Sequence, residues 1–177
     1  MQRNMLIAIG VIAVIVIAVG VYAYYATLQP SVKLVLKDPP AQGTTYGALH
    51  IWVSFSSIEV HQVRSGGNGS WIAIQSTNTT IDLVAIITTP ETLGTFAISS
   101  GNYTEIRFNV TSARVQISAG AAYVSLNITG STVLQAHFPG QLTLSTGQAA
   151  TITADFSADN TSLLSGHLSA NLTASFS

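Results

Sequence analysis

The chain has 177 residues, a formal net charge of −1, charged side chains at only 7% of positions and no cysteine. The sequence shows no basic patch, which argues against nucleic-acid binding. Because the chain has no cysteine, it can have no disulfide scaffold, no catalytic thiol and no cysteine-ligated metal. The polar surface therefore has to be built mainly from Ser, Thr, Asn and Gln.

The first predicted element is an apolar segment from Met5 to Ala26 without a charged residue. About 20 such residues are enough for a helix to cross a hydrocarbon core of about 30 Å. One arginine precedes the segment and three tyrosines close it, as the positive-inside rule and the interfacial aromatic belt lead one to expect. They are Arg3, Tyr22, Tyr24 and Tyr25. We therefore predict a cytoplasmic stub over residues 1–4, a transmembrane signal anchor over residues 5–26 that contacts membrane lipid, and a linker over residues 27–31.

Two alternatives for this segment stay open. Val21-Tyr22-Ala23 resembles a signal-peptidase site, although the apolar stretch is longer than a typical signal h-region. The N-terminal helix of a type IV pilin is also apolar and followed by β structure. The chain lacks the charged leader and the early glutamate of pilin precursors.

Beyond the linker, apolar and polar residues alternate with a period of two, which predicts β-strands. The phase shifts by one residue after Phe55 and again after Val110, and such a slip within a continuous strand pattern indicates a β-bulge. The glycine-rich residues 65–69 predict a hairpin between the strand before them and the strand that starts at Trp71. The apolar positions of the alternation are Val32, Leu34, Leu36, Leu49, Ile51, Val53, Phe55, Ile58, Val60, Ile106, Phe108, Val110, Ala113, Val115, Ile117, Val124, Leu126, Ile128, Leu142, Leu144, Ala150, Ile152, Ala154, Phe156, Leu168, Ala170, Leu172, Ala174 and Phe176.

Some segments are less regular. Residues 80–87 fit either a short strand or a helical turn. Residues 164–176 fit a helical stripe as well as a strand, and their Ser, Thr and Gly content favours the strand. Turns or loops are predicted at residues 39–43, at Pro90 to Gly94 and at Pro139-Gly140.

About eight or nine short strands, spaced by about 8–12 residues, predict an all-β domain over residues 32–177. We expect an antiparallel β-sandwich of the Ig-like or Greek-key type, preceded by one N-terminal transmembrane helix. The strands Val32 to Lys37 and Leu168 to Phe176 are expected at sheet edges. There, unpaired backbone groups could accept a strand from another copy or from an envelope protein.

Seven of the eight asparagines stand in the N-x-S/T acceptor pattern for N-glycosylation. Ser and Thr make up roughly a quarter of the chain, so seven chance matches in a row would occur about once in ten thousand. Only Asn4, on the other side of the apolar segment, lacks the pattern. This division predicts a single-pass cell-membrane protein whose C-terminal domain is extracellular and carries N-linked glycans. The predicted acceptors are Asn68, Asn78, Asn102, Asn109, Asn127, Asn160 and Asn171.

Several stretches together are similar to one family. They read SIEVH at residues 57–61, GSWI at 69–72, TIDLV at 80–84, ISSGNYTEIRFNVTSA at 98–113 and TITADF at 151–156. Across residues 32–157 the chain resembles the DUF4382 family of exported archaeal and bacterial domains. The resemblance implies a lipoprotein-like or membrane-anchored β domain of the cell envelope, and it carries no established activity or catalytic residue.

The candidate chemistry is sparse. His50, His61, His137 and His167 lie far apart without metal-ligand spacing, and no nucleophile elbow or glycine-rich phosphate loop is present. We therefore predict no catalytic residue, no metal site and no cofactor.

Trp52 and Trp71 are the candidate ligand-binding residues, because aromatic side chains on an outer face could form a carbohydrate platform. The sequence favours a non-catalytic surface protein with a structural or assembly role at the envelope, and its edge strands would allow a homo-oligomer. The alternatives are an extracellular carbohydrate-binding module or a pilin-like filament subunit.

Overall fold

The computed structural model describes residues 14–24, 28–38, 47–64, 66, 67, 69–159, 162, 163 and 165–177. Residues 14–24 form a helix whose side chains are exposed. Within these ranges, no helix is long and apolar enough to cross a membrane. The predicted anchor over residues 5–26 falls only partly within them, since residues 5–13, 25 and 26 lie outside the described residues.

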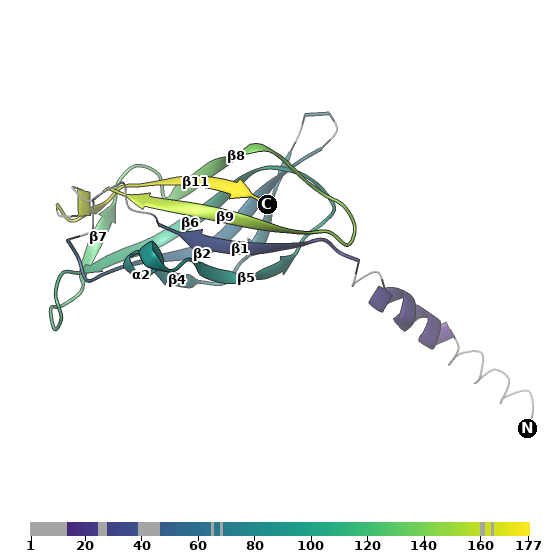
Figure 1. Ribbon diagram of the computed structural model, residues 1–177, viewed down its shortest axis with the longest axis horizontal. Helices are drawn as coiled ribbons and strands as arrows, with labels where there is room; N and C mark the ends of the chain where they lie inside the picture. The colour runs from purple at the N-terminus through teal and green to yellow at the C-terminus, as the bar shows by residue number, and fades with distance from the viewer. Residues whose placement is uncertain are drawn as a thin grey trace, which may run out of the picture.

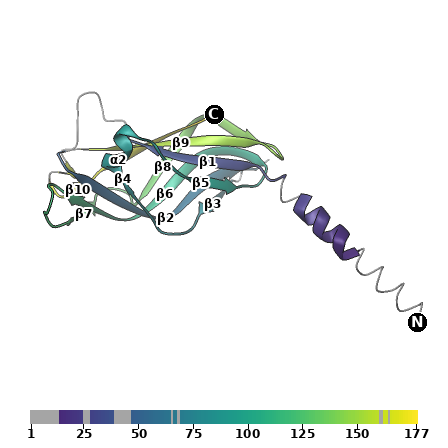
Figure 2. The ribbon, with the colours of Figure 1, turned by 60° about the horizontal axis from the view of Figure 1, so that its bottom comes forward.

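The rest of the described chain is mostly β structure, arranged in two sheets that face each other (Figures 1 and 2). The four-stranded sheet has the order β11 (Ala170–Phe176), β9 (Ala149–Ala158), β1 (Ser31–Lys37) and β5 (Glu91–Ala97). The seven-stranded sheet has the order β10 (His167–Leu168), β7 (Val124–Ile128), β6 (Gly101–Gln116), β2 (His50–Val63) and β3 (Ser70–Gln75). In addition, β4 (Thr79–Asp82) pairs with β2, and β8 (Val133–Leu144) pairs with β6. The short helix α2 spans Leu83–Thr88.

The core lies between the two sheets and is centred on three phenylalanines. Phe55 and Phe108 come from the seven-stranded sheet and Phe156 from the four-stranded sheet, and all three are at most 1% exposed. Their ring centroids lie 5.3 to 5.4 Å apart in tilted or edge-on contacts. Such contacts add to the apolar area that each ring buries, so this triad fastens the sheets together.

Both predicted phase shifts are present. Ser54 pairs with Ser112, whereas the next residue, Phe55, pairs with Val110, so Thr111 is an extra residue on β6. A second irregularity lies between Phe55 and Ser57 on β2. These bulges keep apolar residues facing the core on both sides of each slip.

The topology departs from a purely antiparallel sandwich. β1 pairs with β9 in parallel, and β10 pairs with β7 in parallel. The prediction that β1 lies at a sheet edge was wrong, because β1 lies between β5 and β9. The prediction for the C-terminal strand is confirmed in part: among the described strands β11 pairs only with β9 and ends its sheet, whereas Leu168 belongs to β10, which pairs with β7 in the other sheet.

Three local predictions change. Pro90 to Gly94 is not a loop, because β5 begins at Glu91 and pairs with β1. Pro139-Gly140 is not a turn between strands: β8 runs through it, and the register there slips between the Tyr103 and Glu105 positions of β6. Residues 80–87, which fitted both a strand and a helical turn, contain both, because β4 ends at Asp82 and α2 begins at Leu83.

Tyr103 fixes the turn before β6. Its side chain is fully buried, and its hydroxyl donates a hydrogen bond to the carbonyl oxygen of Ser99. Burial raises the pKa of the Tyr103 phenol above its ordinary value of 10.0, and the hydrogen bond from Gln62 partly opposes this rise. A buried tyrosine bonded to backbone a few residues upstream is the tyrosine corner of Greek-key domains.

Candidate functional site

Two arginines of β6 lie over two tryptophans on the outer face of the seven-stranded sheet. The Arg107 Cζ atom is 4.1 Å from the Trp71 ring centroid, and the Arg114 Cζ atom is 5.1 Å from the Trp52 ring centroid. Trp52 and Arg114 are direct partners across β2 and β6. The adjacent Ile51 is fully buried, so the alternation of a strand turns Trp52 outward, as the sequence predicted.

The Arg107 cluster satisfies its own charges. The Arg107 Nε atom donates to Glu59 Oε2 at 2.7 Å, and Nη2 contacts the same oxygen. Asn109 Nδ2 donates to Glu59 Oε1 at 3.2 Å, and the His61 ring packs against Trp71 at 5.1 Å. Since the guanidinium and both carboxylate oxygens have partners within the chain, this cluster is a structural element of the sheet.

A second cluster lies at the end of the domain away from the helix at residues 14–24, and we call it the tip cluster. It consists of His50, Trp52, Asp82, Arg114 and Tyr123. The His50 and Trp52 rings stack with centroids 4.7 Å apart, and Tyr123 meets Trp52 edge-on at 4.8 Å. The Arg114 Cζ atom also lies 5.0 Å from the Tyr123 ring centroid. Figure 1 shows α2 and β7 at this end and the N-terminal helix at the other.

Asp82 anchors the tip cluster to the fold. Its Oδ1 atom accepts hydrogen bonds from the backbone N–H groups of Ile51 and Val84, both at 3.1 Å. Its Oδ2 atom accepts one from His50 Nδ1 at 2.5 Å. Asp82 is the N-cap of α2, so one carboxylate caps the helix, binds β2 and orients the imidazole.

Arg114 differs from Arg107 in having no anionic partner. Its side chain is exposed, and no residue that the structure describes forms a hydrogen bond or ion pair with its guanidinium. Its Cζ atom lies over the Trp52 and Tyr123 rings, while its N–H donors stay available. Sequence reasoning missed Arg114 and Tyr123. The alternation in SARVQI turns Arg114 outward, but only the β2–β6 register places it on Trp52.

Several large apolar side chains are exposed at the same end of the domain as the tip cluster. Apart from the helix at residues 14–24, the large hydrophobic residues that the structure shows as exposed are Leu49 at 41%, Ile117 at 60%, Tyr123 at 54% and Val124 at 51%. The Leu49 N–H donates to the Gln116 carbonyl, and Val124 pairs with Val115. Leu49, Ile117 and Val124 were predicted to face the core; they continue the inward alternation of Ile51 and Val115 but are exposed.

The two predicted ligand-binding tryptophans do not form one platform. Trp71 pairs with His61, nine residues along β2 from Trp52, so the two rings lie roughly 30 Å apart at about 3.3 Å per residue. Each ring is already in contact with a histidine and an arginine. Both side chains are partly exposed, and both stay candidate ligand-binding residues.

The predicted glycan acceptors lie at the surface to different degrees. Asn78, Asn127 and Asn171 are exposed, and Asn102 and Asn109 are half-buried. The Asn109 Nδ2 atom, to which a glycan would be attached, donates to Ser57 Oγ and Glu59 Oε1. Asn102 Oδ1 accepts a hydrogen bond from Thr143 at 2.9 Å. Asn68 and Asn160 lie outside the described residues.

The histidines remain separate from one another. Three of them contact an oxygen-bearing side chain: His50 contacts Asp82, His61 contacts Thr104 and His137 contacts Glu105. In the part of the chain that the structure describes, no group of three or more His, Asp or Glu side chains comes together to hold a metal ion.

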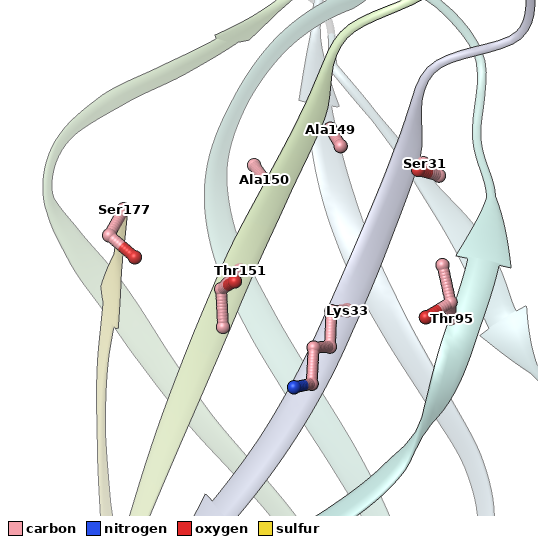
Figure 3. Close-up of a pocket in the computed structure, with 7 residues that line it drawn as sticks. All are labelled: Ser31, Lys33, Thr95, Ala149, Ala150, Thr151 and Ser177. Atoms are coloured by element: carbon pink, nitrogen blue, oxygen red, sulfur yellow. The ribbon is translucent and has the colours of Figure 1, made fainter.

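A shallow hollow of about 260 Å³ lies on the outer face of the four-stranded sheet (Figure 3). Its lining comes from β1, β5, β9 and the residue after β11, and most of the side chains are small. The lining residues are Ser31, Lys33, Thr95, Ala149, Ala150, Thr151 and Ser177. Lys33 is the single charged side chain among them, and more of the lining surface is apolar than polar.

The base of the domain is tied down directly after the N-terminal segment. The Leu28 carbonyl accepts a hydrogen bond from the Gly147 N–H at 2.5 Å, and the Pro30 carbonyl accepts one from the Ile98 N–H at 2.9 Å. The described helix ends at residue 24, and the four steps from there to Leu28 span at most about 14 Å. The chain thus enters the β domain with little slack.

Comparison with known proteins finds one family. A family model described as "Domain of unknown function (DUF4382)" matches residues 29–170. No curated protein and no solved structure matches the chain.

Proposed function

The chain belongs to the DUF4382 family, and we propose that it is a non-catalytic, membrane-anchored and N-glycosylated cell-surface protein with a structural or assembly role at the envelope. The family carries no assigned activity, so the proposal rests on the chain itself. It has three parts: an anchor, a glycosylated exterior and a domain held at a fixed height.

The anchor is supported by the uncharged sequence from Met5 to Ala26, whose length suits a bilayer crossing. An extracellular domain is supported by the seven N-x-S/T acceptors, all of which follow that segment. The exposure of Asn78, Asn127 and Asn171 favours glycan attachment at these positions, because an attached sugar needs open space. The Tyr103–Ser99 bond supports the finer description of the domain as an Ig-like or Greek-key sandwich.

The observation that carries the structural role is the tethering at the base. A receptor that searches for its ligand benefits from a flexible stalk, whose reach grows with its length. Here the Leu28 and Pro30 carbonyls are bonded to the β domain almost immediately after the N-terminal helix. A domain held in this way has a fixed height above the membrane, as a layer or the base of a filament requires.

Lengthening the tether tests the proposal. A Gly/Ser insertion of about ten residues between Thr27 and Leu28 adds roughly 17 Å of flexible reach. We expect it to abolish ordered assemblies, measured by cross-linking and electron microscopy of native membranes, while thermal unfolding of the domain is unchanged. The matched control places the same insertion between Gly66 and Gly67 in the exposed β2–β3 turn. Assemblies that survive the tether insertion as well as they survive the control would contradict a structural role.

A further inference from the structure

We propose that the tip cluster is a self-association site, at which Arg114 of one copy binds Glu91 of a second copy of this chain. The inference rests on the proposed assembly role and names the partner and the residues that make the contact. Three observations support it: the state of Arg114, the distribution of carboxylates and the apolar surroundings.

Arg114 is organised for an external carboxylate. Its guanidinium lies within 5.1 Å of the Trp52 ring centroid and 5.0 Å of the Tyr123 ring centroid. Contact with two rings restricts the side chain, so less entropy is lost when the guanidinium binds a carboxylate through two parallel hydrogen bonds. Arg107, which lies over Trp71, binds the carboxylate of Glu59. Arg114 has no such carboxylate within the described part of the chain.

The chain's own carboxylates leave one candidate partner. All seven Asp and Glu residues lie in the described ranges. Six have polar partners or interactions within the chain, namely Asp38, Glu59, Asp82, Glu105, Asp155 and Asp159. Glu91 is the exception: it is exposed, and no described residue bonds to its carboxylate. If Arg114 finds its carboxylate on another copy, Glu91 is the residue that can supply it without breaking an existing contact.

Glu91 is placed where a second copy can reach it. It begins β5, which ends the four-stranded sheet, and it pairs with Leu36 near the distal end of β1. The next residues of that strand lead to Asp38, whose N–H donates to the Ile86 carbonyl of α2, and α2 is capped by Asp82 of the tip cluster. Glu91 and Arg114 therefore lie toward the same end of the domain but on different sheets. In a twofold interface, Arg114 of each copy can meet Glu91 of the other, so the charge pair forms twice.

The apolar rings beside Arg114 give the contact its strength. The Arg114 Cζ atom lies over Trp52 and Tyr123, and Tyr123 is exposed, so a partner that covers Arg114 also removes ring area from water. Trp, Tyr and Arg are the residues that most often dominate the binding energy of an interface.

A charge exchange in the full-length chain, purified in detergent, tests the inference. Self-association is measured by light scattering coupled to size exclusion over a range of concentrations. R114E and E91R should each weaken association by at least about tenfold, the effect of losing a close interfacial charge pair. The double variant R114E/E91R should recover most of the loss. R64E is the matched control, because Arg64 is an exposed arginine at the other end of β2, and it should associate like the unchanged chain.

Folding is checked by thermal unfolding of each variant, and R114Q serves as a milder replacement if R114E unfolds. Losses in the single variants that add up in the double variant would overturn the pairing, as would an E91R chain that associates normally. If the longer tether abolishes assembly but the double variant R114E/E91R does not recover association, the assembly role stands and Glu91 is not the partner. If the double variant recovers association but the longer tether leaves assembly intact, the pairing of Arg114 with Glu91 stands and the fixed height above the membrane is wrong.

Discussion

The Tyr103 hydroxyl lies 2.6 Å from the carbonyl oxygen of Ser99, a residue four positions earlier in the chain. The bond closes the turn between β5 and β6 from inside the core. Gly101, with a φ of 154°, lies within this turn, and a Cβ atom there would approach the Gln62 side chain to 2.4 Å. The turn is thus held by a side-chain hydrogen bond together with a position that favours glycine.

Replacing Tyr103 by Phe should destabilise the domain. The ring still fills its site, but its hydrogen bond to the Ser99 carbonyl is lost, and a typical intramolecular hydrogen bond contributes about 0.5–1.5 kcal/mol. Chemical denaturation of Y103F and of the unchanged chain measures the difference. Y123F is the control, because Tyr123 is exposed, and it should stay within about 0.5 kcal/mol of the unchanged chain. Equal stability of all three chains would show that the bond contributes nothing.

The same residue predicts a loss of stability in alkali. Because the pKa of Tyr103 is raised in the folded state, the unfolded chain gives up this proton at a lower pH than the folded chain. The stabilising contribution is therefore complete below about pH 10 and is lost as the pH rises through the raised folded-state pKa. Denaturation series at increasing pH should show a steeper decline for the unchanged chain than for Y103F. Parallel declines would contradict the assignment.

Asp82 should matter through its backbone hydrogen bonds. D82A removes the acceptor for the Ile51 and Val84 N–H groups, and loss of an N-cap typically costs about 0.5–2 kcal/mol. D82N keeps an oxygen in the same place and should lose less. Thermal unfolding of both variants gives the comparison, and a D82N chain no more stable than D82A would show that the charge matters rather than the geometry.

The fraction of each acceptor asparagine that carries a glycan should increase with the exposure of its side chain. Asn78, Asn127 and Asn171 are exposed and should be modified most completely. Asn109 should be modified least, because its Nδ2 atom is engaged with Ser57 and Glu59. Glycopeptide mass spectrometry of the native protein measures each position. Full occupancy at Asn109 would mean that modification precedes the formation of this part of the sheet.

Local pattern predicted much of the fold. The alternation in residues 32–36 and 152–156 predicted strands whose apolar side chains are now buried, and the slips at Phe55 and Val110 located real bulges. These features depend on neighbours in sequence, which periodicity can show. Pro139 and Glu91 were misjudged because pairing with distant strands overrides local turn preferences.

Apart from the predicted hairpin of β2 and β3, which is confirmed, the sequence could not predict which strands are neighbours. Nothing in the residues 31–37 indicates a parallel partner at residues 149–155. The tip cluster depends on the same information, since Arg114 meets Trp52 only through the register of β2 and β6. Trp52 was identified by its outward position, whereas the arginine above it needed the three-dimensional structure.

The central position of β1 has a consequence for the order in which the domain forms. Ser31 pairs with Ala97 on one side and with Ala149 on the other. During synthesis, β1 therefore cannot be enclosed on both sides until most of the chain has left the ribosome. Contacts between residues so far apart in sequence slow folding, because a long loop must close before they form. The segment that joins the domain to its N-terminal helix is thus among the last parts of the chain that can be held in place on both sides.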